Sequence, residues 1–394
     1  MASQPAHPAT PMTTELLQHF DQNIAARLAW VDCPSNPWRQ VIIPLALKSP
    51  MVLCTLLSLS SEDLAYRYVH DHPRRRYLQD VSMRFRNNAL TLLAEHMRSM
   101  RERQRLQIQY IDPNETRHAL ASTLVLYNVE LLGAEAVKWR MHLQAGRVIL
   151  QWKEQASPDA ASLDEIDTFL FYEHYYSSVF AGLTTFRTVD EPSGDMLRHG
   201  DNITIFSDFV RVIHRITQIE RVRFNQGSTI DPTQVEDVKH QIEEAWKRMT
   251  QLGQTFHFRS RSAQQDFTQL ICIFYHASLI YGYRVLANDP SIEAQVQESR
   301  DSILQLLSCL SDKRTFAHDL TWPLFIAGTE CRGLPEMQAI VSQEMETVMK
   351  ISGVLDRQKV LSFLKHYWSI DLEPNATWIH LMRDKVQEGS MLIL

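Results

Sequence analysis

Apolar residues recur at steps of three and four along most of the chain, and this spacing predicts helices. The first periodic segment shows the pattern at Leu16, Leu17, Phe20, Ile24, Leu28 and Val31. No run rich in Val, Ile and Thr alternates with period two, so the sequence predicts no strand. Glycine is scarce, with 12 among 394 residues, which disfavours folds built on many tight glycine turns. The expected fold is all-α: an irregular multi-helix array of antiparallel helical hairpins, with a dozen or more helices.

Proline and polar residues divide this helical pattern into segments. Residues 1–12 are rich in Pro and Ala and are expected to be a disordered N-terminal segment, which leaves 13–394 as the folded domain. The polar loop 187–202 is the candidate for a seam between subdomains. In the second half of the chain the pattern predicts helices at 204–224, 232–252, 262–287, 291–310, 320–331, 335–352, 356–369 and 374–387.

Charge and cysteine content narrow the classes of function. The chain has 46 acidic and 40 basic residues, a formal net charge of −6, which disfavours a protein that coats nucleic acid. The closest pair of its five cysteines, Cys33 and Cys54, lies 21 residues apart, so no local metal knuckle exists. The most apolar stretch, Phe267–Leu286, contains His276 and Arg284, which predicts a buried helix and no membrane association.

Motifs that carry common enzyme chemistry are missing from the sequence. Neither the dinucleotide motif G-x-G-x-x-G, the phosphate loop G-x-x-x-x-G-K-[ST] nor the nucleophile elbow G-x-S-x-G occurs. Cys54, Cys272 and Cys309 stand in apolar helical contexts, where a small buried hydrophobic residue is the favoured interpretation. We therefore expect no enzyme and assign no catalytic, cofactor-binding or metal-binding residue and no cofactor.

Two histidine-containing stretches are candidate sites. His70-Asp71-His72 has a spacing that can bind a metal on a strand, but no third ligand stands nearby, so a metal site is disfavoured. Glu173-His174 lies in an aromatic-dense segment without the zinc motif H-E-x-x-H. A hydrogen-bonded interior histidine is the favoured interpretation there, and an aromatic-lined ligand pocket stays open.

One segment concentrates basic charge. Nine arginines occur within the 32 residues 74–105. A nuclear import signal or a surface for an acidic partner is one interpretation. The favoured one is a solvated helix face with intrahelical pairs between Glu95 and Arg98 and between Glu102 and Arg105.

Three segments of the chain carry a resemblance to a known family. Residues 36–60 open with N-P-W-R and continue into a helix of small and aliphatic residues. Residues 123–150 predict a helix pair with Trp139 and the step H-L-Q-A-G that ends at Gly146. Residues 321–332 read T-W-P-L-F-I-A-G-T-E-C-R and are followed later by Trp368. In this order they resemble the fungal-specific transcription factor domain, over roughly residues 30–385.

The resemblance implies that 13–394 is the regulatory domain of a zinc-cluster type transcription factor, located in the nucleus. Family members carry an N-terminal module of six cysteines that holds two zinc ions and reads DNA. Residues 1–32 contain no cysteine and only Arg27 as a basic residue, so that module is not expected here. Gly146 and Gly328 are expected to let neighbouring helices approach closely, as packing residues.

The leading hypothesis is a regulator that consists of this domain alone, or a gene whose DNA-binding exon is lost or misassigned. It would act through protein partners, a zinc-cluster factor or itself, with DNA contacted indirectly or weakly and with a small-molecule effector as an option. One alternative is a transcription factor that binds DNA directly through the Arg-rich region 74–105. The other is an enzyme for small molecules on an all-α scaffold.

Overall fold

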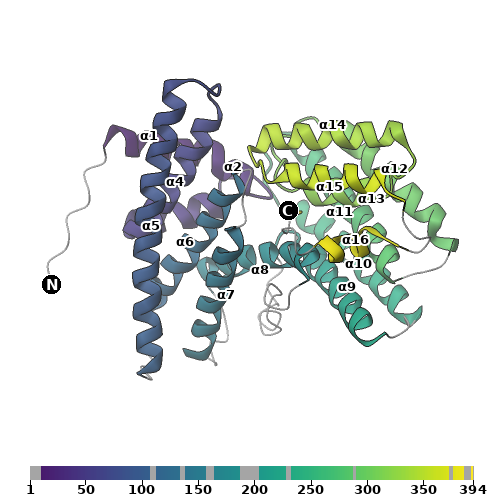
Figure 1. Cartoon of the computed structure of the whole chain (residues 1–394), viewed down its shortest axis with the longest axis horizontal. Coiled ribbons are helices and arrows are strands. Elements are labelled where there is room, and N and C mark those ends of the chain that lie inside the picture. Colours follow the sequence, from purple (N-terminus) through teal and green to yellow (C-terminus); the bar gives the residue numbers. More distant parts are fainter. Residues whose placement is uncertain are drawn as a thin grey trace.

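The computed structural model confirms the all-α class: helices make up the regular structure of the described residues, and no strand occurs among them. Figure 1 shows two lobes joined by α8 (Glu165–Thr185). We call α1–α7 the N-terminal lobe and α9–α16 the C-terminal lobe. The structure describes residues 10–106, 112–133, 138–156, 164–186, 204–227, 232–286, 290–371, 376–385 and 392–393.

The N-terminal lobe packs its helices around α6, which is buried on nearly all sides from Ala119 to Leu131. Helix α5 is the longest of the described helices and runs along the outside of the lobe (Figure 1). The elements of the lobe are α1 (Pro11–His19), η1 (Phe20–Ile24), α2 (Ala25–Leu28), η2 (Trp38–Ile42), α3 (Ile43–Lys48), α4 (Pro50–Tyr66), α5 (Pro73–Arg105), α6 (Pro113–Leu131) and α7 (Trp139–Ala156).

The C-terminal lobe is built around α11 and α13, which are buried along most of their length. Its elements are α9 (Ser207–Gln226), α10 (Pro232–Gly253), α11 (Arg261–Leu286), η5 (Pro290–Ile292), α12 (Glu293–Cys309), α13 (Thr321–Thr329), α14 (Pro335–Ser352), α15 (Arg357–Ser369) and α16 (Trp378–Lys385). The helices predicted for this half of the chain are all found, with ends that differ by at most four residues. Residues 287, 374–375 and 386–387 of the predicted ranges lie outside the described residues. The apolar stretch Phe267–Leu286 is the buried part of α11, as predicted.

Four helices of the N-terminal lobe, α1, α4, α5 and α6, begin with a side-chain cap followed by proline. At α4, Ser49 accepts a hydrogen bond from the Val52 amide, and Pro50 occupies the first helical position, where its missing N–H costs nothing. At α6, Asp112 and Pro113 repeat the arrangement.

None of the helices among the described residues is long and apolar enough to cross a membrane.

The predicted N-terminal disordered segment and the predicted seam both include residues that the structure does not describe. Helix α1 begins at Pro11, inside the segment 1–12 that was expected to be disordered, because Thr10 accepts a hydrogen bond from the Thr13 amide and caps it. Residues 1–9 lie outside the described residues, and so does the predicted seam 187–202.

The two glycines chosen from the sequence do sit at close helix contacts. A Cβ atom on Gly146 would lie 2.3 Å from Cε1 of His174, and one on Gly328 would lie 2.8 Å from a methyl of Leu364. The Gly328 carbonyl also accepts a hydrogen bond from the Trp368 indole at 2.8 Å. Both residues act as packing residues, as expected.

The contact at Gly146 gives a stability prediction. We expect Gly146→Ala to lower the free energy of unfolding by about 1–3 kcal/mol, because the His174 ring is rigid and buried. This loss exceeds the gain of up to about 1 kcal/mol that alanine brings to a helix interior. Urea denaturation followed by circular dichroism measures the difference.

Gly182→Ala is the matched control, since Gly182 is also buried inside a helix but a Cβ there would have its nearest neighbour 3.9 Å away. We expect that variant to be as stable as the parent or slightly more stable. A Gly146→Ala variant as stable as Gly182→Ala would contradict the contact.

Candidate functional site

The segment between α2 and η2 is fixed by polar contacts of the N-P-W-R motif. The Asn36 amide donates to the Ala25 carbonyl at 2.9 Å, and its oxygen accepts from the Trp38 amide at 2.9 Å. The Trp38 ring is buried and meets Phe169 of α8 edge to face at 5.5 Å. Arg39 forms an ion pair with Asp32. The motif therefore positions a short crossing segment, residues 29–38.

This crossing segment joins the cores of the two lobes. Trp38 packs in the core of the N-terminal lobe, whereas Trp30 packs against the core of the C-terminal lobe. The Trp30 ring stacks on Phe206 with centroids 4.4 Å apart and meets Phe274 edge on at 5.5 Å. Arg259 adds an ion pair to Asp32 at 2.7 Å.

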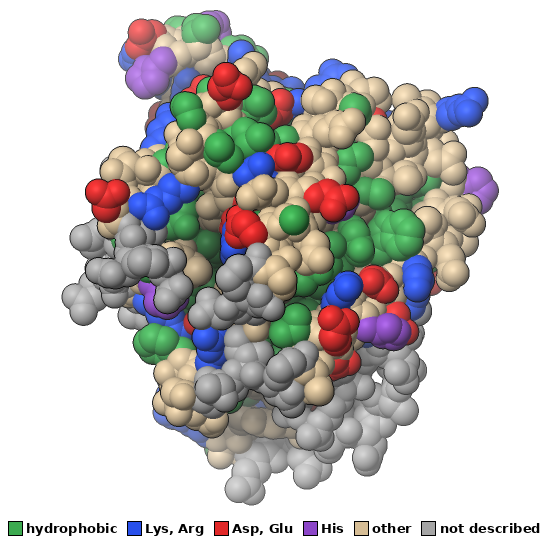
Figure 2. All heavy atoms as spheres, turned by 90° about the vertical axis from the view of Figure 1, so that its right-hand side faces the viewer, with side chains coloured by type: hydrophobic (Ala, Val, Ile, Leu, Met, Phe, Trp, Pro, Cys, Tyr) green, Lys and Arg blue, Asp and Glu red, His purple; other side chains and the backbone are tan. Residues whose placement is uncertain are grey.

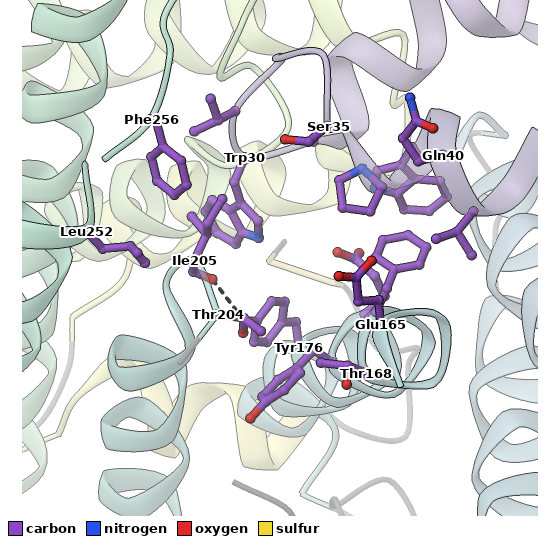
Figure 3. A pocket seen from close by; sticks show the side chains of 18 residues that line it. Trp30, Ser35, Gln40, Glu165, Thr168, Tyr176, Thr204, Ile205, Leu252 and Phe256 are labelled. Atoms are coloured by element: carbon purple, nitrogen blue, oxygen red, sulfur yellow. Dashed lines mark hydrogen bonds between the residues drawn. The ribbon is translucent and has the colours of Figure 1, made fainter. Parts of the chain in front are cut away.

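Beside the crossing segment lies a cavity of about 430 Å³, which falls in the size range of sites for small molecules. In Figure 3, Trp30 projects into it from the segment above, Tyr176 rises from α8 below, and Leu252 and Phe256 close it from the end of α10. Its lining residues are Ala29, Trp30, Val31, Ser35, Pro37, Trp38, Gln40, Val41, Glu165, Thr168, Phe169, Tyr172, Glu173, Tyr176, Thr204, Ile205, Leu252 and Phe256. Aromatic and aliphatic walls with a few polar groups are typical of binding sites.

One wall of the cavity is held by a strained backbone. Phe206, at the start of α9, has φ +60°, which is unusual for a residue with a side chain. Its buried ring under Trp30 and the bonds of the neighbouring chain hold it there. The Tyr176 hydroxyl bonds the Thr204 hydroxyl at 2.6 Å and donates to the Ile205 carbonyl at 2.9 Å. These contacts tie the start of α9 to α8.

Glu173 is the polar group that sets the chemistry of the cavity. Its carboxyl has no hydrogen-bond or ion-pair partner within the described part of the chain. Burial, together with the smaller effect of the nearby Asp319 carboxyl, raises the pKa of Glu173 to about 8. Near neutral pH the protonated form therefore predominates in the absence of a bound cation.

A small inner cavity of about 20 Å³ lies behind Glu173, with room for about one water molecule. Asp319 and His318 line it from the α12–α13 connection, and Asn128 lines it from α6. Burial raises the pKa of Asp319 well above its usual value and lowers the pKa of His318 to about 3. Arg357 fixes that connection through hydrogen bonds to the Ala317 and His318 carbonyls.

His174, next to Glu173 in sequence, points away from the cavity. Its Nε2 donates to the Leu120 carbonyl at 3.1 Å, which fixes the neutral tautomer, and burial lowers its pKa to about 4. It is the interior histidine that the sequence favoured.

His72, for which a metal site was disfavoured, has a local structural role. Its Nδ1 accepts a hydrogen bond from the Arg74 amide, and its ring stacks on Tyr68 at 4.9 Å. It is therefore the N-cap of α5. Among the described residues no group of three His, Cys, Asp or Glu side chains could hold a metal ion.

The arginines of α5 are partly used inside the fold. Three of them pair with carboxylates of other helices: Arg74 with Glu15 at 2.7 Å, Arg86 with Glu130, and Arg103 with Glu115 at 2.5 Å. Sequence reasoning missed these contacts, because the partners lie up to 59 residues away.

The two intrahelical pairs predicted for α5 have different outcomes. Glu102 and Arg105 are in contact at 4.0 Å, as predicted. The pair between Glu95 and Arg98 is not formed, and Arg98 donates to the Ala94 carbonyl instead. A backbone acceptor one turn away competes with an exposed ion pair that is worth little.

The sequence predicted only one wall of the cavity. The aromatic-dense segment of α8 indicated a pocket that could bind a ligand, and Glu173 lies in it. Trp30, Ile205 and Phe256 come from three distant segments, and no local pattern could place them at the same cavity.

Comparison with known proteins supports the sequence resemblance. A family model described as the fungal specific transcription factor domain matches residues 15–393. The match covers nearly the whole chain and includes all three segments that carried the resemblance. A search of curated proteins and a search of solved structures each returned no match.

The buried carboxyl gives a pH prediction. An unfolded glutamate has a pKa near 4.3, so between that pH and about 8 the folded protein holds a proton that the unfolded chain releases. Rising pH therefore destabilises the folded protein through Glu173. We expect Glu173→Gln to gain stability relative to the parent as pH rises from 5 to 8.5, by up to about 1.4 kcal/mol per pH unit.

Urea denaturation at several pH values measures this difference. Because only Glu173 changes between the two proteins, the opposing effects of the buried histidines cancel in the comparison. If the free energy of unfolding changed with pH in the same way for both proteins, the prediction that Glu173 is buried without a partner would be wrong.

Proposed function

Since the chain belongs to the fungal-specific transcription factor domain family, we propose that it is a nuclear transcription regulator that acts through protein partners and responds to a small effector in the cavity. The family match over residues 15–393 carries the proposal. Family membership supports a role in transcription regulation and a nuclear location. Action through protein partners and the response to an effector are the parts of the proposal that go beyond family membership.

The position of the cavity supports the effector part of the proposal. Its walls come from the crossing segment, from α8, and from the C-terminal lobe through Ile205 and Phe256. A molecule bound there touches elements of both lobes at once. Binding can then shift the balance between arrangements of the lobes, provided that the molecule fits one arrangement better.

The charges of the molecule support action through partners. Arg74, Arg86 and Arg103 of the Arg-rich region already pair with carboxylates, which reduces the charge that α5 could offer to phosphates. On the face of the C-terminal lobe in Figure 2, acidic and basic side chains are interspersed among the described residues. Such a face lacks the concentrated basic charge of a DNA-binding surface. The five widely spaced cysteines do not supply a six-cysteine zinc cluster within this sequence.

Tethering to DNA tests the regulatory role. We fuse the chain to an unrelated DNA-binding module in a fungal host and measure a reporter with the matching site. The expected result is a change in reporter output, together with nuclear accumulation of a fluorescent fusion. A folded fusion that leaves output unchanged in every condition would contradict the proposal.

Direct DNA binding is tested with the purified chain in an electrophoretic shift assay. We expect at most weak binding that falls steeply with salt and does not distinguish promoter sequences. The double variant Arg98→Glu, Arg101→Glu should abolish this weak DNA binding, since both side chains are exposed. Selective binding to one promoter without any partner would instead support the alternative in which α5 contacts DNA.

A further inference from the structure

The charged side chains that line the cavity are all acidic among its described lining residues. Glu165 stands at the exposed rim, Glu173 stands deeper, and no Lys or Arg is present. Behind Glu173, the Asp319 Oδ2 atom also lacks a hydrogen-bond partner within the described chain. Arg357 lies near Asp319, whereas Glu173 has only the Asp319 carboxyl as a charged neighbour among the described residues, so the Glu173 carboxyl makes the site attractive to positive charge.

The walls are suited to the same kind of ligand. Rings of Trp30, Trp38, Phe169, Tyr172, Tyr176 and Phe256 line the cavity. Aromatic faces carry negative potential and attract organic cations, most strongly when water is excluded. They also bury apolar surface, so a ligand with both a cationic group and an apolar body matches the lining.

We infer that the cavity binds an organic cation, a protonated amine on an apolar body, whose ammonium group donates to the carboxylate of Glu173. The inference rests on the proposed function, in which the cavity is the effector site, and it adds the chemical class of the effector. An ammonium supplies both the charge and the hydrogen-bond donor that the Glu173 carboxyl lacks. An anionic ligand would meet the carboxyls of Glu165 and Glu173 and no Lys or Arg among the described residues that line the cavity.

Three probes with one phenyl ring and similar chains test the inference: 4-phenylbutylamine, 4-phenylbutan-1-ol and 5-phenylpentanoate. Binding to the full chain is measured by isothermal titration calorimetry and by tryptophan fluorescence. At pH 8.5 we expect the amine to bind at least tenfold more tightly than the alcohol, and the carboxylate to bind least.

Two variants locate the interaction. Glu173→Gln should reduce the affinity for the amine to that for the alcohol and leave the alcohol almost unchanged, since Gln keeps the shape of the side chain. Glu165→Gln is the matched control, because it removes an acidic group from the exposed rim of the same cavity. That variant should keep the preference for the amine, and thermal unfolding shows that both variants are folded.

The pH dependence of binding is a further readout. The titratable groups around Glu173 are Asp319, His318, Tyr127, Tyr172, Tyr176 and Glu165. Because the raised pKa of Glu173 leaves its carboxyl mostly protonated at pH 7, the affinity for the amine should rise roughly 5- to 10-fold from pH 7 to 8.5. The rise should be lost in Glu173→Gln, which separates Glu173 from the other groups.

The outcomes separate this inference from the proposed function. Equal binding of amine and alcohol, or tighter binding of the carboxylate, would overturn the cation class and leave an effector site in place. An amine preference that survives Glu173→Gln would overturn the role of Glu173. If none of the probes binds at millimolar concentration, the cation inference is overturned, whereas the regulatory role is judged separately by the tethered reporter.

Discussion

The fold depends on one short crossing segment that inserts a tryptophan into each lobe. Trp38 enters the N-terminal core and Trp30 stacks on Phe206 at the edge of the C-terminal core, eight residues apart in sequence. Buried aromatic rings contribute large apolar areas, so both lobes are stabilised through this segment. The polar groups of Asn36 and the ion pairs of Asp32 keep it in one conformation. The cavity exists because the segment spans the lobes without filling the space beside α8.

In and beside the cavity, two features lower the stability of the folded protein. Glu173 places an unpartnered carboxyl where burial disfavours its charge, and Phe206 adopts a backbone conformation that costs on the order of 1–2 kcal/mol for a residue with a side chain. Several helices outside the cavity follow the usual rules, with capped starts and packed glycines, although Phe186 also has a positive φ. Such departures concentrate at functional sites, because a site is shaped for its ligand and the surrounding packing sustains the cost.

The sequence predicted the fold class and the later helices well, because helical periodicity and proline positions are local signals. It also predicted the packing roles of Gly146 and Gly328, which follow from the absence of a side chain. It could not predict that Arg86 pairs with Glu130 or that Phe256 and Trp30 line the same cavity, because these positions depend on how distant helices pack. The aromatic-dense segment around Glu173 indicated a pocket, whereas its other walls had no sequence pattern.

The location of the cavity limits how a bound molecule could act. A ligand shifts an equilibrium only by its difference in affinity between two states, so a site within one rigid lobe would transmit little to the rest of the chain. Here Trp38 and Phe169 belong to one side of the cavity, and Ile205 and Phe256 belong to the other. Any change in how the lobes sit alters the distance between these walls and hence the fit of the ligand. The same geometry that leaves Glu173 without a partner therefore makes an occupant of the cavity sensitive to the arrangement of the whole domain.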